Sequence, residues 1–137
     1  REIFALVKTA KTMGLKKVVV THAEFPSQNL TGDEQKELAD MGAVIEHCFT
    51  PTYTAKATWE ATFANIRKTG VSRTFISTDL GQTINPPVAE RFGMFAQKLL
   101  DAGFTAEREF VCCMHRTTVL KALPRAVPAV ARNVAGA

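Results

Sequence analysis

Three short apolar runs in this sequence are each followed by polar side chains that could bind a metal or move a proton. These polar residues are His22, Glu24, Glu46, His47, Asp79 and Gln82. Imidazole and carboxylate groups are the ligands that zinc and similar divalent ions accept, and catalytic sites of this kind keep one coordination position for water. A carboxylate beside the ion can take the proton from that water. The sequence therefore predicts metal-assisted hydrolysis, with His22 and Asp79 as metal ligands and Asp79 also as the general base.

Each candidate also has a purely structural interpretation. His22 is equally explained as a strand-end histidine that is hydrogen-bonded to Glu24 or to a loop carbonyl, and His47 as a packing residue. Asp79 begins Asp-Leu-Gly, a common turn sequence, and Gln82 is also explained as a solvated loop residue. A site role is favoured for Asp79 because it follows an apolar run closely, where a carboxylate requires a cation or several hydrogen-bond donors.

The elements that must position these side chains are marked by glycines and capping residues. Apolar residues at helical spacing stop at glycines about thirty residues apart, and these are Gly14, Gly42, Gly70 and Gly103. Thr31 with Glu34 has the spacing of a capping box, and Pro86-Pro87 suits the first turn of the next helix. Helices are therefore predicted between the apolar runs.

The apolar runs have the composition of short strands buried on both faces. They cover residues 18–20, 43–45 and 74–77. Strands that alternate with helices through short connections predict right-handed βα units and a parallel sheet, hence an α/β fold. A unit of about thirty residues is typical of the eightfold (β/α)8 barrel of TIM type, whose active site lies at the carboxyl ends of the strands. The polar candidates follow the runs at that edge.

The number of units predicts only part of such a barrel. Three strands cannot close a barrel of about 250 residues, and the sequence opens inside a helical pattern without an initiator Met. We therefore expect residues 1–110 to be the C-terminal part of the barrel, with about three to four βα units, in a fragment that lacks the N-terminal half. Residues 111–137 break the pattern and are expected to form an irregular tail, weakly ordered or disordered.

Composition and charge argue against several classes of function. With 46% hydrophobic and 22% charged residues, the chain has the composition of a globular unit. The formal net charge is +4, but basic residues form scattered pairs such as Lys16-Lys17 without an aromatic platform, so nucleic-acid binding is not expected. No apolar stretch approaches the roughly 18 residues of a membrane span, and no targeting peptide is expected.

The three cysteines favour a reducing compartment. They are odd in number and two of them, Cys112 and Cys113, are adjacent, so neither a disulfide framework nor a zinc Cys-x-x-Cys pair is predicted. We therefore expect a cytoplasmic protein, with Cys48 in the core. His115 lies close to the adjacent pair, but adjacent cysteines rarely reach one tetrahedral ion together, so no metal site is expected there.

Two stretches of the sequence resemble an uncharacterised family of amidohydrolase-like barrel proteins. They read Val-Val-Val-Thr-His-Ala-Glu-Phe-Pro at 18–26 and Ile-Ser-Thr-Asp-Leu-Gly-Gln at 76–82. The resemblance extends over about residues 1–105, including Gly-Ala-Val-Ile-Glu at 42–46 and Asn-Pro-Pro at 85–87, and it stops in the tail. It implies the C-terminal half of a metal-dependent hydrolase of the amidohydrolase superfamily.

The resemblance also assigns roles to individual residues. In that superfamily the metal ligands are a His-x-His on the first strand, a fourth-strand residue, histidines on strands five and six, and an aspartate on strand eight. By resemblance His22 is the strand-six histidine and Asp79 the strand-eight aspartate. Glu46 and His47 fall on strand seven, which has no fixed ligand, so they remain candidates, with Glu24 and Gln82, for supporting the ligands or contacting substrate.

The same resemblance predicts an incomplete site. No His-x-His occurs in this sequence, so we expect the chain to be inactive alone. The whole protein is expected to use a divalent metal, zinc first and manganese or another ion as the alternative, to cleave an amide, ester, lactone or phosphoester bond in a small-molecule substrate. One alternative is a lyase or decarboxylase on the same scaffold. Another is a noncatalytic partial barrel that forms homo-oligomers through uncovered sheet edges.

Overall fold

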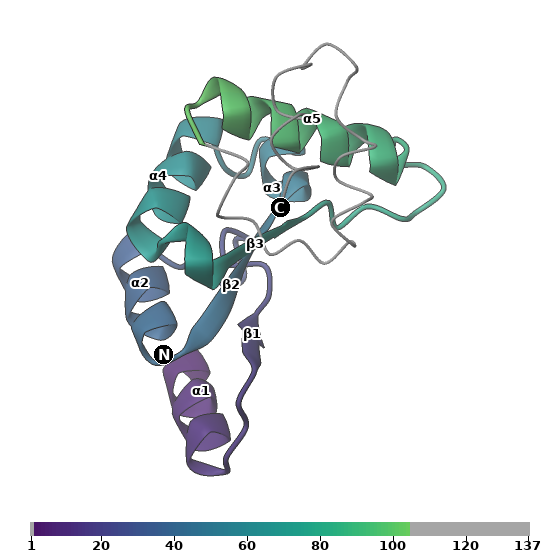
Figure 1. Ribbon diagram of the computed structural model, residues 1–137. Helices are drawn as coiled ribbons and strands as arrows, with labels where there is room; N and C mark the ends of the chain where they lie inside the picture. The colour runs from purple at the N-terminus through teal and green to yellow at the C-terminus, as the bar shows by residue number, and fades with distance from the viewer. Residues whose placement is uncertain (1, 105–137) are drawn as a thin grey trace, which may run out of the picture.

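The structure is a computed structural model that describes residues 2–104. Its elements are α1 (Glu2–Thr12), β1 (Val18–Val20), α2 (Gly32–Asp40), β2 (Ala43–Cys48), α3 (Phe49–Tyr53), α4 (Trp59–Thr69), the short 3-10 helix η1 (Val71–Arg73), β3 (Thr74–Ser77) and α5 (Val88–Asp101) (Figure 1). The strands form one sheet in the order β1-β2-β3, and both pairs are parallel. The predicted parallel α/β arrangement is thus confirmed for this part of the chain. The predicted tail, 111–137, lies outside the described residues.

The strands lie where the apolar runs predicted them, and β2 is longer than its run. β1 and β3 coincide with residues 18–20 and 74–77. β2 continues from the apolar run through Cys48, because Ile45–Cys48 pair with Thr74–Ser77 of β3. Glu46 and His47 are therefore strand residues rather than loop residues, and their side chains point to opposite faces of the sheet.

The predicted helix boundaries agree with the structure. The Glu34 backbone N–H donates to Thr31 Oγ1 at 3.3 Å, and the Thr31 N–H donates to Glu34 Oε2 at 2.8 Å, which completes the capping box of α2. Gly70 ends α4 with a φ of 88°, a left-handed conformation that costs glycine no Cβ clash. Pro87 directly precedes the first residue of α5. These local signals mark where α2 and α5 begin and where α4 ends.

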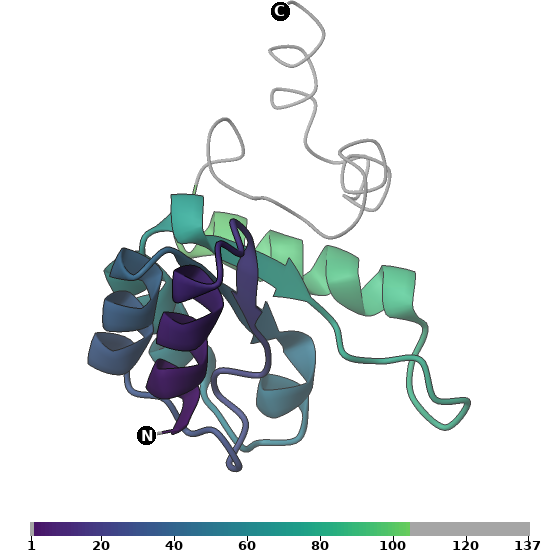
Figure 2. The ribbon, with the colours of Figure 1, turned by 90° about the horizontal axis from the view of Figure 1, so that it is seen from below.

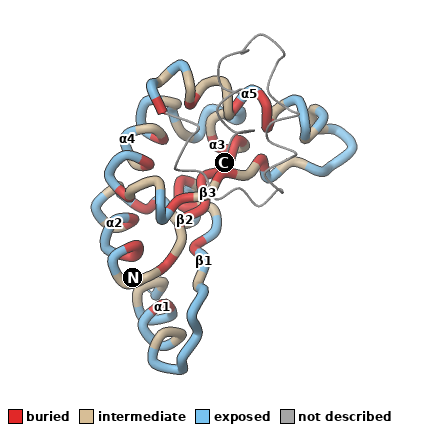
Figure 3. The backbone as a smooth tube through the Cα atoms, viewed as in Figure 1, coloured by how far each residue is buried: buried red, intermediate tan, exposed pale blue. Residues whose placement is uncertain are grey.

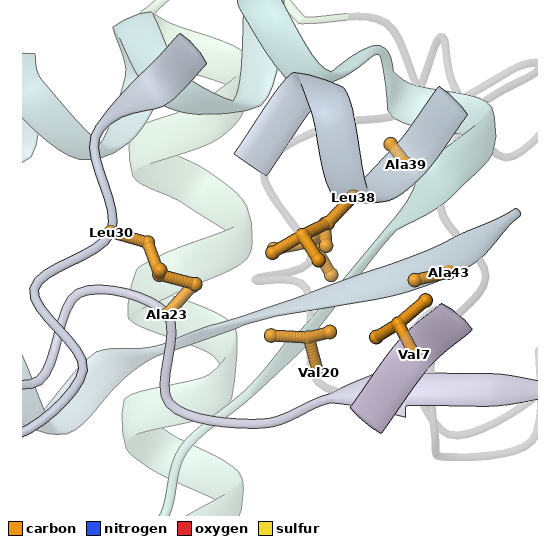
Figure 4. Close-up of a cluster of buried hydrophobic side chains, with 8 residues drawn as sticks. Val7, Val20, Ala23, Leu30, Leu38, Ala39 and Ala43 are labelled. Atoms are coloured by element: carbon orange, nitrogen blue, oxygen red, sulfur yellow. The ribbon is translucent and has the colours of Figure 1, made fainter. Parts of the chain in front are cut away.

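One face of the sheet is covered by the helices. The strand pairing places Val18, Val20, Ala43, Ile45, His47, Thr74 and Ile76 in rows on this face. Val20 and Ile45 pack with Val7 of α1 and Leu38 of α2 in one hydrophobic cluster. Figure 4 shows Val7, Val20, Leu38 and Ala43 directed into this shared interior. Helix α1 and the β1-to-α2 segment are held to the sheet by this cluster.

A second hydrophobic cluster holds the C-terminal helices on the same face. Ile76 of β3 is buried with Ile66 of α4 and with Phe92, Phe95 and Leu99 of α5. Aromatic contacts extend this cluster. The ring centroids of Trp59 and Phe95 are 5.3 Å apart in an edge-to-face contact. Helices α2 and α4 run side by side along the sheet (Figures 1 and 2).

The opposite face of the sheet belongs to neither hydrophobic cluster of the described residues. Its rows consist of Val19, Val44, Glu46, Cys48, Phe75 and Ser77. Val19 is 52% exposed, whereas Glu46 and Cys48 near the carboxyl edge are buried. In Figure 3 the buried backbone is concentrated around β2 and β3, and the chain that leads into β1 is exposed. Below we call this face of the sheet the open face. The segment from β3 to α5 leads away from the same edge and is mostly exposed (Figure 2).

A search of the described residues finds no helix with the length and apolar character needed to cross a membrane.

Candidate metal centre

Four side chains from all three strands converge at the carboxyl edge of the sheet. His22 lies two residues after β1, Glu46 and Cys48 are on β2, and Asp79 lies two residues after β3. The His22 Nδ1 atom is 3.3 Å from Cys48 Sγ, 3.9 Å from Glu46 Oε2 and 4.0 Å from Asp79 Oδ2. One imidazole nitrogen thus lies near a thiol and two carboxylates, and the ligand atoms of His22, Glu46 and Cys48 are also close to one another.

The same histidine nitrogen faces all three partners, and this differs from the arrangement of a catalytic triad. In a triad the histidine contacts the nucleophile through one ring nitrogen and the carboxylate through the other, so that a proton can pass across the ring. Here Nδ1 alone faces both the sulfur and the carboxylates. Ligand atoms of His22, Glu46 and Cys48 lie within 4.8 Å of one another, which is the arrangement of donors around one shared cation.

The loops after β1 and β3 hold their site residues in left-handed backbone conformations. His22 has a φ of 58° and Asp79 a φ of 52°. The His22 backbone N–H donates to Glu46 Oε2 at 3.3 Å, and Thr50 Oγ1 donates to the carbonyl oxygens of Thr78 and Asp79 at 2.8 and 3.0 Å. Non-glycine residues adopt such φ values infrequently, and these cluster at functional sites. Hydrogen bonds of β2 and α3 with the backbone of these loops thus hold His22 and Asp79 in place.

The site combines two carboxylates with no basic side chain from the described region. Within residues 2–104, the ion-pair partner of both Glu46 and Asp79 is His22, and no Lys or Arg approaches either within 4.0 Å. The Glu46 side chain is 10% exposed and that of Asp79 is 37% exposed. Glu46 is withdrawn from water and so favours a bound cation, because a cation replaces the lost hydration. Asp79 is exposed, so the burial expected for it from the sequence is not found.

Cys48 is held at this site as a neutral thiol when no cation is bound. Burial raises its pKa to about 12, and the neighbouring Glu46 and Asp79 carboxylates act in the same direction, whereas the hydrogen bond from Ser77 opposes the shift. The Ser77 hydroxyl donates to Cys48 Sγ at 3.3 Å. A buried neutral thiol is a poor nucleophile, because the thiolate is the reactive form.

Glu24 and His47 form a separate buried pair on the helix-covered face. His47 Nδ1 lies 2.6 Å from Glu24 Oε1, and the same carboxylate accepts hydrogen bonds from Gln35 Nε2 at 3.4 Å and Asn65 Nδ2 at 3.3 Å. Within residues 2–104, neither His47 Nε2 nor Gln35 Oε1 has a hydrogen-bond partner. This network joins the β1-to-α2 loop to α2, β2 and α4, and it lies on the other side of the sheet from the candidate metal centre.

The structure thus separates the residues that the sequence singled out. It brings His22, Asp79 and Glu46 together and directs His47 and Glu24 to the opposite face. Gln82 is exposed in the loop before α5, where its backbone carbonyl accepts from the Asn85 N–H.

Cys48 was expected in the core, and it is buried as expected, but its sulfur faces the candidate centre. The available signal was its spacing from Glu46. Residues i and i+2 of a strand share a face, so a strand that runs through Cys48 places both on the side opposite to His47. That signal is readable only once the strand is known to continue past Ile45.

Comparison with known proteins gives one partial match and no assigned activity. The model of a family of unknown function, DUF6282, matches residues 1–46, which contain α1, β1, α2 and the first part of β2. His22 and Glu46 lie within the matched segment, and Cys48 and Asp79 lie outside it. No curated protein and no solved structure shows a significant match to the chain.

Proposed function

We propose that this chain supplies part of the metal site of a (β/α)8-barrel hydrolase of the amidohydrolase type. One observation carries the proposal: His22 Nδ1 lies within 4.0 Å of carboxylates from both β2 and the loop after β3. Together with the resemblance described above, this argues for a divalent ion bound at the carboxyl edge. Zinc is the first candidate and manganese the alternative, because imidazole and carboxylate donors suit both.

The one-sided covering of the sheet supports the barrel interpretation. In a (β/α)8 barrel the helices cover the outer face of the strands, the inner face lines the barrel, and the active site lies at the carboxyl mouth. The three parallel strands here carry their helices on one face. The open face would then be the interior, and further strands of the barrel would continue the sheet beyond β1 and β3.

The chemistry follows from what each side chain can do. When bound, a divalent cation supplies a Lewis acid and lowers the pKa of water near it. His22 and Glu46 hold their donor atoms toward the shared region, and burial of Glu46 limits competition from solvent. Asp79 is the most accessible carboxylate of the site, so it is the residue placed to accept a proton from water during hydrolysis.

The bond that is cleaved is proposed only as a class. Amide, ester, lactone and phosphoester hydrolysis share the need for an activated water and a proton acceptor. A lyase or decarboxylase on the same scaffold would use the cation to stabilise charge on a small-molecule substrate instead. Product analysis separates these classes, since hydrolysis incorporates an oxygen atom from labelled water and decarboxylation releases carbon dioxide.

The proposal is tested by the metal content of the purified chain. After treatment with a chelator and reloading with zinc or manganese, elemental mass spectrometry should find a stoichiometric ion in the unmodified chain. His22→Ala and Asp79→Ala should each reduce that content strongly, because each removes a donor from the shared region. Asp33→Ala is the matched control, since the Asp33 side chain is 82% exposed and pairs with Lys68 away from the site.

His115→Ala controls for binding by the histidine outside the described residues. Metal retained in both site variants but lost with His115→Ala would contradict the proposal. An unmodified chain that binds neither ion would remove the metal site altogether. Turnover need not accompany binding, because the first-strand His-x-His of the superfamily does not occur in this sequence.

A further inference from the structure

We infer that Cys48 is a sulfur ligand of the same ion, so that the centre selects a thiophilic cation such as zinc over magnesium or manganese. The inference rests on the proposed metal site and goes beyond it, because neither the resemblance nor the family match assigns a role to a cysteine on this strand.

The position of the sulfur is the first argument. Cys48 Sγ lies 3.3 Å from His22 Nδ1, nearer than either carboxylate oxygen of the site, which lie 3.9 and 4.0 Å from that nitrogen. Its strand neighbour on the same face, Glu46, completes a group whose ligand atoms are within 4.8 Å of one another. A cation that reached His22 and Glu46 would therefore also meet the sulfur.

The surroundings of the sulfur are the second argument. A cysteine that serves only as a small apolar residue packs among apolar side chains. Cys48 is 1% exposed, yet it belongs to neither of the two hydrophobic clusters of residues 2–104. Its described partners are an imidazole nitrogen and the Ser77 hydroxyl, which donates to the sulfur at 3.3 Å. Such a donor also stabilises a thiolate.

The alternative role, a nucleophilic cysteine, fits this arrangement poorly. A nucleophile must be reached by substrate, and Cys48 is almost fully buried. His22 presents to it the same ring nitrogen that faces Glu46 and Asp79, so the ring cannot pass a proton between sulfur and carboxylate. Coordination needs neither access by substrate nor a proton relay.

A nitrogen, oxygen and sulfur donor set has a definite preference among ions. On binding, the cation replaces the thiol proton of Cys48, and that proton leaves to solvent. Thiolate ligands select zinc and other soft or borderline ions, whereas magnesium and manganese favour oxygen. Three protein donors leave a fourth tetrahedral position for water or for Asp79, as in catalytic zinc sites.

Cobalt(II) binding tests the inference in the full chain. Cobalt(II) substitutes for zinc, and a thiolate ligand adds a sulfur-to-metal charge-transfer band in the near ultraviolet that oxygen and nitrogen ligands do not produce. We expect this band in the unmodified chain and its loss in Cys48→Ser. A double variant, Cys112→Ser with Cys113→Ser, is the matched control and should retain the band.

The outcomes separate this inference from the proposed function. Stoichiometric cobalt without the band, or a band that only the double variant loses, would overturn the role of Cys48 and leave the metal site standing. No cobalt in the unmodified chain would overturn both. In Cys48→Ser the ratio of zinc affinity to manganese affinity should fall at least roughly tenfold. Loss of a residue that only hydrogen-bonds to a metal ligand already costs about that much metal affinity.

A second measurement does not depend on the folding of a variant. X-ray absorption at the zinc edge of the zinc-loaded, unmodified chain should show a sulfur neighbour at about 2.3 Å. The same measurement on the Cys112→Ser, Cys113→Ser variant, in which Cys48 is the one cysteine, should show the same sulfur neighbour. A shell of nitrogen and oxygen neighbours without sulfur would contradict the inference.

Discussion

At the scale of single residues, the two positions predicted as ligands have unusual backbone geometry, which they share with Asn29 and Ala55 among the described residues. His22 and Asp79 have φ values of 58° and 52°, and each lies two residues beyond the end of a strand. Left-handed conformations cost most non-glycine residues about 1 kcal/mol or more, although Asp and His adopt them more readily than branched residues. Folding alone therefore does not require these side chains at these positions.

A pair of substitutions at residue 22 separates backbone strain from metal binding. His22→Gly and His22→Ala both remove the imidazole, so both should lose the metal. The glycine variant should be the more stable of the two by about 1 kcal/mol, because alanine keeps the steric cost of a positive φ. Urea unfolding in the presence of a chelator measures the difference. An alanine variant as stable as the glycine variant would argue against a left-handed residue 22.

The raised pKa of Cys48 predicts how the stability of the metal-free chain depends on pH. The folded thiol has a pKa of about 12, whereas the ordinary pKa of a cysteine thiol is 9.0. Between these values the unfolded chain loses the proton and the folded chain keeps it, so the free energy of unfolding falls as the pH rises. The slope attributable to Cys48 approaches about 1.4 kcal/mol per pH unit, and below pH 9 this contribution is constant.

This dependence is measured as a difference between the unmodified chain and Cys48→Ala. Urea unfolding of both chains is measured at about pH 8 and about pH 10.5. Titration of the other groups cancels in the difference in unfolding free energy, because both chains share those groups. Between the lower and the higher pH, the free energy of unfolding should fall more in the unmodified chain than in Cys48→Ala. A difference that does not change with pH would mean that the folded thiol titrates normally.

At the scale of secondary structure, the sequence predicted where the strands lie but not which side chains share a face. Gly42 and Gly70, the capping box at Thr31 and the apolar runs act within a few residues, so they are readable from the chain. The length of β2 depends on its pairing with β3, which lies far along the sequence. For that reason the sequence alone places His47 and Glu46 at the same edge of the sheet and cannot show that their side chains point to opposite faces.

The buried Glu24–His47 pair should stabilise the fold rather than bind the ion. Glu24→Ala would leave His47 Nδ1 and the donors of Gln35 and Asn65 without their acceptor, which should cost about 3 kcal/mol of unfolding free energy. Glu37→Ala, on the exposed side of α2, is the control and should change stability by less than about 0.5 kcal/mol.

Thermal and urea unfolding of both glutamate variants without metal measure this effect. Glu24→Gln should recover part of the loss, because its amide oxygen can still accept a hydrogen bond. If Glu24→Ala were as stable as Glu37→Ala, the buried network would not be structural, and Glu24 would become a candidate for the site instead.

At the scale of the whole molecule, the helices cover one face of the sheet, and the open face is available for association with another chain. Val19 on the open face is 52% exposed, and β1 and β3 are the outer strands of the sheet that the described residues form. Exposed edges and apolar side chains favour pairing with another chain. The sequence could predict the parallel units, but it could not predict what covers this face, because coverage depends on contacts that no local pattern encodes.

We expect the purified chain to self-associate through the open face. Val19→Lys should shift the sedimentation coefficient toward that of a monomer, since a charge at this position is costly to bury. Ile84→Lys is the matched control, because Ile84 is 87% exposed on the loop before α5, away from the sheet rows. A chain that sediments as a monomer at all concentrations would remove this expectation.

The alternation of Glu46, His47 and Cys48 has a further consequence for how the chain finds its correct fold. A shift of β2 by one residue relative to its neighbours would exchange the two faces. His47 would leave Glu24, while a carboxylate and a thiol would move beneath α2 and α4, where burying the unpaired charge costs several kcal/mol. Glu46 and Cys48, which are proposed to bind the ion, therefore also disfavour misaligned sheets, and the Glu24–His47 pair on the other face acts in the same direction.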